Sequence, residues 1–144
     1  MIINHTIKLE TKEGVSFYDL TPKIKGLLIE SKVKNGYILV FTKHTTSAII
    51  INENEERLLE DFRLYLEKLA PKNAKYLHDD ISLRDCQPNE RLNGHSHLKA
   101  LSLNSSEMIP IINGNIELGK WQAVLFIELD GGRNREIIVQ LCGE

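Results

Sequence analysis

Residues 37–41 read YILVF and residues 48–51 read AIII, and these two apolar runs decide the fold. β-Branched and aromatic residues dominate both runs, which favours strands over helices. Because neither run contains a polar residue, the first predicts a central strand buried on both faces, and the second is similar. The residues between them, 42–47, are polar and include His44, so a polar loop is expected between two core strands.

Outward from these runs, the pattern predicts two long helices and an N-terminal strand. A half-buried strand is expected over residues 2–10. Thr21 is a good N-cap and Pro22 suits the first helical position, so a helix is expected to begin there. A second helix is expected after Asn52 or Asn54, either of which can cap it. Its apolar stripe comprises Leu58, Phe62, Tyr65, Leu66 and Leu69.

The second half of the chain predicts one short helix and several strands. Residues 71–91 show no strong period, and a short helix is expected at about 95–104 with Leu98 and Leu101 on its apolar face. Asn113-Gly114 is a hairpin signal. The strands are expected at 109–112, 115–118, 121–129 and 136–141. The order of elements predicts an α+β fold, a mostly antiparallel or mixed β-sheet with packed helices.

Length and composition limit the class of protein. A chain of 144 residues corresponds to a single domain, residues 1–144. A net charge of −2 gives no basic surface for nucleic acid, and no apolar run reaches the roughly 18 residues of a membrane span. Residues 1–8 lack the pattern of a signal peptide, and Cys86 and Cys142 are far apart in sequence. A cytoplasmic protein with reduced thiols is therefore expected.

Four histidines, His44, His78, His95 and His97, lie in polar segments beside predicted core elements. Histidine together with carboxylate is typical of zinc, manganese or iron sites, whereas the alternative for each is a capping or solvent-exposed side chain. His95 and His97 at a helix start diverge by about 200° around the axis, so only one of them is expected to point into a given site.

Other polar groups have both a functional and a structural interpretation. The acid pair at 79–80 suits Mg²⁺ completed by substrate phosphates, or is a solvated turn. Residues 52–56 cap a helix, or present side chains and N–H groups to an anion. Arg133 and Arg135 lie at a glycine-rich hairpin tip, where they either bind a phosphate through paired N–H groups or only make the hairpin soluble. Trp121 is expected in the core or at an interface rather than as a stacking platform.

Several short motifs in a fixed order carry a resemblance to a known family. They are FTKHTTSA at 41–48, NEN at 52–54, HDD at 78–80, NGHSHLK at 93–99, GKWQ at 119–122 and DGGRNR at 130–135. Together they resemble the YjbQ-like family, also called secondary thiamine-phosphate synthases, over essentially the whole chain. The resemblance implies a YjbQ-like fold, a homotrimer and a site near the subunit boundary. It also implies that a pyrimidine diphosphate and a thiazole phosphate are joined, with release of pyrophosphate, as a weak or secondary activity.

The resemblance also implies which residues carry that activity, with a divalent metal ion, zinc or magnesium, as cofactor. The expected metal ligands are His44, His78 and His97. The expected catalytic residues are His44, Asn52, Glu53, Asp80, Gln122 and Arg135, and the expected substrate-binding residues are Thr45 and Trp121. Arg133 is added to the substrate-binding residues because of its place at the glycine-rich hairpin tip. His95 belongs to a version of the motif that other members lack, and Lys120 stands where the family often has Thr.

Four hypotheses follow from these residues. The first is a metal-assisted transferase, in which Arg135 clamps phosphate and electrostatic stabilisation replaces a covalent intermediate. The second is a metal-dependent phosphohydrolase that uses the same groups to activate water. The third is a non-enzymatic trimeric protein that binds a small phosphorylated ligand. The fourth, a structural or interaction protein, leaves the polar loops without a role. The expected partners are a small phosphorylated substrate and further copies of the chain.

Overall fold

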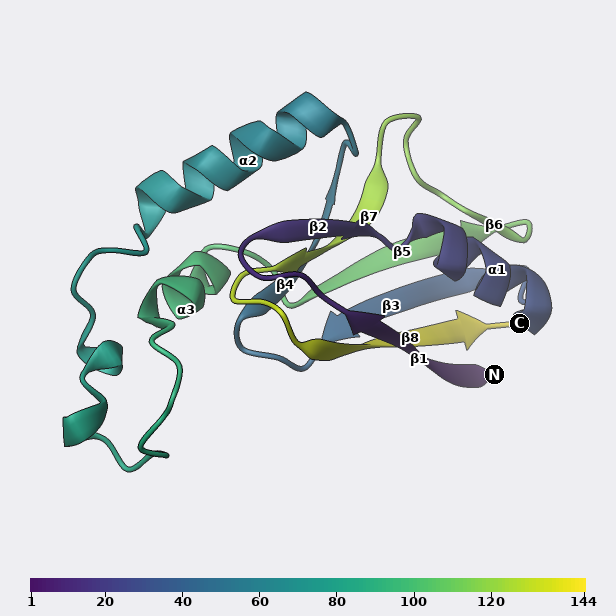
Figure 1. The fold of residues 1–144 in the computed structure, drawn as a ribbon. Coiled ribbons are helices and arrows are strands. Elements are labelled where there is room, and N and C mark those ends of the chain that lie inside the picture. The colour runs from purple at the N-terminus through teal and green to yellow at the C-terminus, as the bar shows by residue number, and fades with distance from the viewer.

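Two antiparallel sheets form the framework of the computed structural model, which describes residues 1–144 (Figure 1). The larger sheet has the order β1 (Ile2–Glu10), β8 (Asn134–Gly143), β3 (Gly36–Thr42), β5 (Ser106–Ile112) and β6 (Asn115–Ile116). The smaller sheet has the order β2 (Ser16–Asp19), β7 (Ala123–Glu128) and β4 (Ser47–Asn52). The helices are α1 (Thr21–Ser31), α2 (Glu56–Leu69) and α3 (Gly94–Leu101), with 3₁₀ turns η1 (Leu77–Asp79) and η2 (Ile81–Leu83). The α+β prediction is confirmed.

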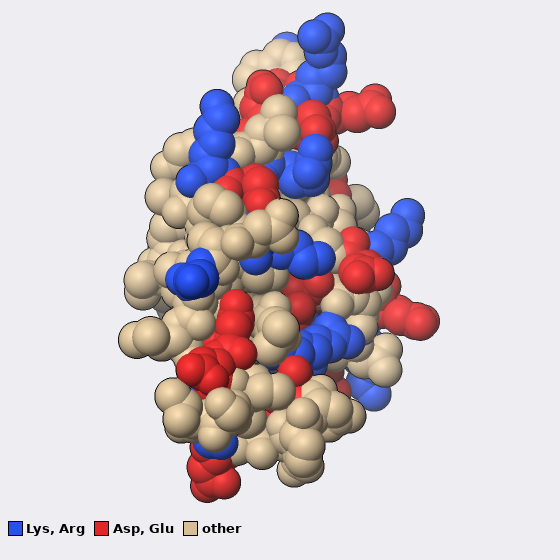
Figure 2. All heavy atoms as spheres, turned by 60° about the vertical axis from the view of Figure 1, so that its left-hand side comes forward, with Lys and Arg blue, Asp and Glu red and all other residues tan.

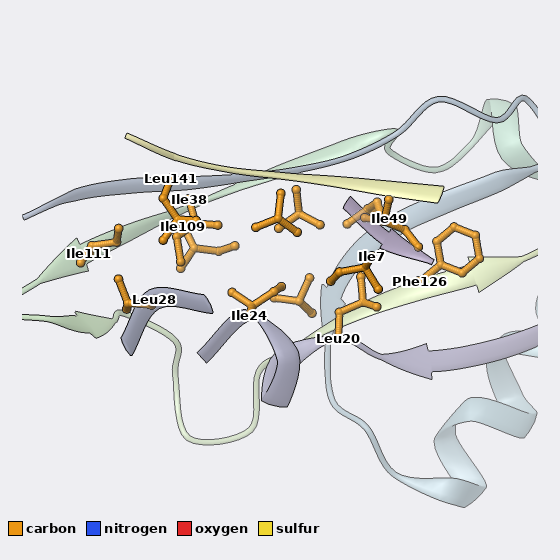
Figure 3. Packing of buried hydrophobic residues seen from close by; sticks show 14 of the residues in the cluster. Ile7, Leu20, Ile24, Leu28, Ile38, Ile49, Ile109, Ile111, Phe126 and Leu141 are labelled. Atoms are coloured by element: carbon orange, nitrogen blue, oxygen red, sulfur yellow. The ribbon is translucent and has the colours of Figure 1, made fainter. Parts of the chain in front are cut away.

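The main core lies between the inner face of the larger sheet, helix α1 and the smaller sheet (Figure 3). Ile24 and Leu28 of α1 point toward Ile38 and Ile109 across this layer. A second, smaller cluster lies under α2 and α3, where Leu66 is the only fully buried residue of α2. Helix α2 is therefore attached to the body over a narrow strip.

Strand β3 was predicted to be buried on both faces, and in the chain it is buried on only one. Ile38 and Val40 are fully buried, but Tyr37 is 39% exposed and Phe41 is 37% exposed. The reason is that the larger sheet carries α1 on its inner face and no second layer of this chain on the other. The outer face is thus apolar and uncovered.

The helix starts differ from the predicted caps. Leu20 occupies the N-cap of α1, and the Thr21 hydroxyl instead accepts the Val124 N–H at 2.9 Å. Glu55 caps α2 in place of Asn52 or Asn54, because its carboxylate reaches the N–H groups of Arg57 and Leu58. Asn52 is still the last residue of β4. A longer acidic side chain one residue before the helix thus replaced the expected asparagine cap.

Helix α3 packs with the face opposite to the one predicted. Leu98 and Leu101 are 43% and 84% exposed, while Ser96 and Lys99 are buried. Polar partners hold this buried face, since the Ser96 hydroxyl donates to the Leu129 carbonyl at 2.6 Å. Polar groups are buried where hydrogen bonds satisfy them, and hydrophobic periodicity alone does not report this.

Two further predictions have clear outcomes. The Asn113-Gly114 hairpin is confirmed, with both residues at positive φ, as a two-residue hairpin turn requires. Strand β2 was not predicted, because its short run, SFYD, shows no extended alternation. None of the helices combines the length and the apolar composition that crossing a bilayer requires.

Candidate functional site

A buried carboxylate, Glu128 at the end of β7, shapes the turn that carries the site. Its side chain is 0% exposed, and Oε2 accepts the backbone N–H groups of Leu129, Asp130 and Gly131, each at 3.0 Å. Gly131 has a φ of 67°, and a Cβ there would lie 2.0 Å from the Lys12 carbonyl oxygen. The turn therefore requires glycine, and its geometry is fixed by one carboxylate.

Arg135, on β8 of the larger sheet, neutralises Glu128, at the end of β7 in the smaller sheet. Its Nε donates to Oε1 at 2.7 Å and its Nη2 donates to Oε2 at 2.6 Å, while Thr46 accepts from Nη2 at 2.8 Å. Burial alone would raise the pKa of Glu128, but hydrogen bonds from Arg135 and Thr11 outweigh it and lower that pKa. Arg135 was expected to clamp a phosphate. In the structure its guanidinium donates to Glu128 and Thr46, so Arg135 stabilises the turn that carries the site.

Asp130 links this turn to the start of α3. Its Oδ2 accepts from Asn93 Nδ2 at 3.0 Å and from Arg133 Nε and Nη2 at 3.0 and 2.8 Å. Burial opposes ionisation of Asp130, but the hydrogen bonds from Asn93 and Arg133 outweigh it, and its pKa is lowered. Asp130 thus stays ionised and holds Arg133 in place.

His78 and His97, which are distant in sequence, are in contact. Their ring centroids lie 4.6 Å apart in an edge-on arrangement. Burial lowers the pKa of His97, and the charges of His78, Arg84 and Arg133 lower it further, against an opposing effect of Asp130. Arg84 also donates to the His78 carbonyl at 2.7 Å. We call these five residues the histidine cluster; it is His78, Arg84, His97, Asp130 and Arg133.

His44 and Thr45 line a groove of about 450 Å³, and His97 is the one member of the histidine cluster that also lines it. His44 Nε2 accepts the Glu136 N–H at 2.9 Å. Burial and then the charges of Arg135 and Lys43 lower the pKa of His44. The groove is therefore lined by two neutral imidazoles at pH 7.

The chain does not assemble the three-histidine metal site that was predicted. No three His, Cys, Asp or Glu side chains gather closely enough to hold a metal ion. His78 and His97 are paired, but the bond from the Glu136 N–H occupies His44 Nε2, which leaves the ring proton on Nδ1. The donor set within one chain therefore does not fit a three-histidine ion site.

The two aspartates of the HDD motif, Asp79 and Asp80, make different contacts. Asp80 is exposed, and its Oδ1 accepts the Ser82 hydroxyl at 2.8 Å. Asp79 is the one that turns toward α3, where its Oδ1 accepts the Gly94 N–H at 2.8 Å. A Cβ at position 94 would lie 2.6 Å from Tyr76 Cβ, so the close approach of the loop to α3 needs glycine. Asp79 thus attaches the His78 segment to the helix that carries His97.

The remaining predicted residues lie at the opposite end of the smaller sheet. Asn52 pairs with Ala123, whereas Ser47, next to the His44 loop, pairs with Glu128. At about 3.3 Å per residue these ends are roughly 16 Å apart. This distal group comprises Asn52, Glu53, Trp121 and Gln122.

Local contacts in the distal group are within its own loops. The Asn52 side chain accepts the Glu53 N–H at 2.8 Å, and the Gln122 side chain accepts the Gly119 N–H at 2.8 Å. Trp121 is 67% exposed, with Lys120 Nζ 4.9 Å from its ring centroid, so it is not a core residue. The predicted site is therefore divided within one chain into a histidine side and a distal side.

Three residues of the site were missed from the sequence. Glu128 had a usable signal, because a lone carboxylate inside the apolar run 123–129 must find a cation when the strand is buried. Asp130 was quoted only as part of a motif. Arg84 lies in the aperiodic loop and had no signal at all.

Comparison with known proteins places this architecture. A sequence profile described as UPF0047 protein YjbQ-like matches residues 5–144. A UPF0047 protein of Methanothermobacter thermautotrophicus is 41% identical over 143 residues, covering 99% of this chain and 94% of that protein. A YbjQ-like protein of unknown function from Sulfolobus solfataricus P2 superposes with a TM-score of 0.89 at 30% identity, covering 100% and 99% of the two chains. A hypothetical protein from Aeropyrum pernix K1 gives the same TM-score and identity, covering 99% of each chain.

Proposed function

This chain belongs to the UPF0047 family of YjbQ-like proteins, and from that premise we propose that it is a cytoplasmic enzyme acting on a small phosphorylated substrate at the histidine cluster. The observation that carries the proposal is the contact of His78 and His97 beside two guanidinium groups, Arg84 and Arg133. Arginine forks and neutral imidazole N–H groups together suit the oxygens of a phosphate or diphosphate.

The reaction we propose is the joining of a pyrimidine diphosphate to a thiazole phosphate. The bond between the pyrimidine methylene carbon and the diphosphate oxygen breaks, and the thiazole nitrogen forms a bond to that carbon. Pyrophosphate leaves with the bonding electrons, and the thiazole nitrogen becomes cationic without losing a proton. The step therefore needs no base, and its main demand is for groups that stabilise the leaving pyrophosphate.

The histidine cluster meets that demand without a covalent intermediate. Arg84 and Arg133 would take the charge of the departing diphosphate, and Asp130 fixes the direction of the Arg133 guanidinium. Neutral His97 would donate a hydrogen bond to a phosphate oxygen. The orientation of Arg133 also depends on the backbone turn that Glu128 holds, because Asp130 is part of that turn.

We propose that a homotrimer completes the site. The outer face of the larger sheet carries Tyr37, Phe41, Met108 and Ile112, all exposed in the single chain. Strand register places Ile2 on this face as well, opposite Cys142. An exposed apolar sheet face suits burial against further copies of the same chain. Such an assembly would also give the distal group of one copy access to the histidine side of another.

The test is a pyrophosphate-release assay with the pyrimidine diphosphate and the thiazole phosphate as substrates. We expect turnover by the wild-type protein, and a loss of roughly tenfold to a hundredfold in kcat for Arg84→Gln, Arg133→Gln and His97→Ala. His5→Ala, on β1 and outside the groove, is the matched control and keeps the wild-type rate. Equal, near-background rates in wild type and His97→Ala would overturn the proposal. Turnover of phosphate esters without the thiazole partner would assign a phosphohydrolase, and tight binding without any turnover would assign a ligand-binding protein.

A further inference from the structure

A second cavity lies on the other side of helix α3 from the histidine cluster. It has a volume of about 700 Å³ and lies between α2, α3, the 130–132 turn and the loop at residues 13–15. Basic and acidic side chains are interleaved on this side of the molecule (Figure 2). The proposed reaction does not use this cavity, which shares only the Asp130 region with the histidine cluster.

His95 lines this cavity, as the divergence of His95 and His97 around α3 predicts. The His95 residue is 8% exposed, so it is more than nine-tenths buried. Its Nδ1 lies 3.1 Å from the Lys99 ammonium, which has only protons to offer and therefore donates. The ring proton must then be on Nε2, and no group of the chain accepts it. His95 Nε2 is a fixed hydrogen-bond donor without a protein acceptor.

Lys99 adds a second donor beside it. Its side chain is 1% exposed and donates to Glu67 Oε2 at 3.1 Å as well as to His95. An ammonium group has three N–H bonds, so one remains after these two contacts. No enclosed side-chain nitrogen or oxygen of the chain lacks a hydrogen-bond partner, so His95 Nε2 opens on the cavity. The cavity that His95 and Lys99 both line therefore suits a ligand that supplies an acceptor to these donors.

The charges around the cavity favour an anion. Three carboxylates line the cavity: Glu67 is paired with Lys99, Asp130 is paired with both Arg133 and Arg91, and Glu13 forms no salt bridge. Lys72 and Arg91 line the same cavity; Lys72 forms no salt bridge, and Arg91 shares Asp130 with Arg133. Glu13 offsets the charge of Lys72, and the two guanidinium groups that share Asp130 leave one net positive charge beside the donors, which is the arrangement that oxyanion recognition uses.

We propose that this cavity binds a small organic anion, one oxygen of which accepts from His95 Nε2 and Lys99 Nζ. The shared chemistry is a terminal oxyanion, either a phosphate or a carboxylate group. Because α3 separates the cavity from His97, the anion is a second ligand and not the substrate of the proposed transferase. A bound anion would also tie α2 to the 130–132 turn through Glu67, Lys99 and the cavity wall.

The test follows the ¹⁵N-labelled imidazole signals of His95 and His97 during titration at pH 7.5 and constant ionic strength. One arm uses inorganic phosphate and the other uses acetate. We expect a saturable shift of the His95 Nε2 signal in at least one arm. Lys99→Met is expected to weaken the apparent affinity about tenfold or more. Lys72→Met is expected to weaken the apparent affinity severalfold. Because Lys72 is exposed, this substitution does not disturb a buried group.

His97→Phe is the matched control, because it alters the histidine cluster and leaves the second cavity intact. The His95 response is expected to survive in this variant even if the transferase activity is lost, so the two proposals fail independently. A response to phosphate alone assigns a phosphorylated ligand, and a response to acetate alone assigns a carboxylate. No saturable His95 shift in either arm, or an unchanged affinity in both lysine variants, would overturn the inference.

Discussion

Replacing Arg135 by methionine tests how the candidate site is built. The substitution keeps most of the side-chain length and removes the guanidinium that pairs with Glu128. Glu128 would then be an ionised carboxylate at 0% exposure without a cation. Breaking a buried ion pair by removing one partner costs about 3–5 kcal/mol of unfolding free energy. The three backbone N–H groups that still bind Oε2 favour the lower end of that range.

The measurement is urea and thermal unfolding of wild type and Arg135→Met at pH 7. For a chain of about this length, 1 kcal/mol corresponds to roughly 2–4 °C, so the Tm is expected to fall by about 6–12 °C. The double variant Glu128→Gln/Arg135→Met is expected to regain part of the loss, because no buried charge remains. Arg63→Met, which breaks an exposed pair with Glu60, is the control and is expected to cost less than about 1 kcal/mol.

Lower pH gives an independent check on the same variant. Once Arg135 is gone, burial is the main influence on Glu128 and raises its pKa, so the carboxyl is protonated at a higher pH than in the wild type. The gap in stability between wild type and variant is therefore expected to narrow as the pH falls from 7 to 5. A loss below about 1 kcal/mol at pH 7, or a gap that widens on acidification, would refute this account of the Glu128 turn.

Three further predictions address other parts of the molecule. The pKa values of His44, His97 and Glu128 are lowered, so the folded state binds fewer protons than the unfolded state on acidification. The unfolding free energy is therefore expected to fall first below about pH 6.5, where the unfolded histidines take up protons, and again below about pH 4.3, where the unfolded glutamate does. Chemical unfolding between pH 8 and 4 checks this, and a flat profile would contradict it. Phe41→Asp is expected to convert the proposed trimer into monomers in light scattering coupled to size-exclusion chromatography, and an unchanged mass would argue against the outer face. Gly131→Ala is expected to lower the unfolding free energy by at least about 1–3 kcal/mol, because its φ is 67° and the new Cβ would also lie 2.0 Å from the Lys12 carbonyl oxygen. A neutral effect would contradict the fixed turn.

Local patterns predicted the elements of the fold well where one residue type decides the geometry. Pro22 near the start of α1 and Asn113-Gly114 in the hairpin are examples, since each restricts the backbone directly. The prediction for β3 was wrong for the isolated chain, because an apolar run reports that both faces avoid water and does not say what covers them. The orientation of α3 was also wrong, because Lys99 is buried through partners that lie far away in sequence.

The candidate site shows the same division between local and long-range information. The polar loops could be identified because His44 and the HDD segment interrupt or follow apolar elements. Their grouping could not, because the contact of His78 with His97 depends on how a long loop returns to α3. Register separated the distal group from the histidines, since β4 and β7 pair antiparallel and place Asn52 and Ser47 at opposite ends.

In the function proposed above, Arg84 and Arg133 make the histidine cluster a phosphate-binding site. The most direct measurement is a titration with pyrophosphate that monitors the ¹⁵N-labelled imidazole signal of His97. It compares wild type with the Arg84→Gln/Arg133→Gln double variant. Arg57→Gln, at an exposed position of helix α2, is the control for the loss of one arginine charge outside the histidine cluster. We expect a saturable His97 shift in wild type and in the control, and an affinity for pyrophosphate about tenfold or more weaker in the double variant. An equal affinity in wild type and double variant, or no His97 response at all, would contradict it.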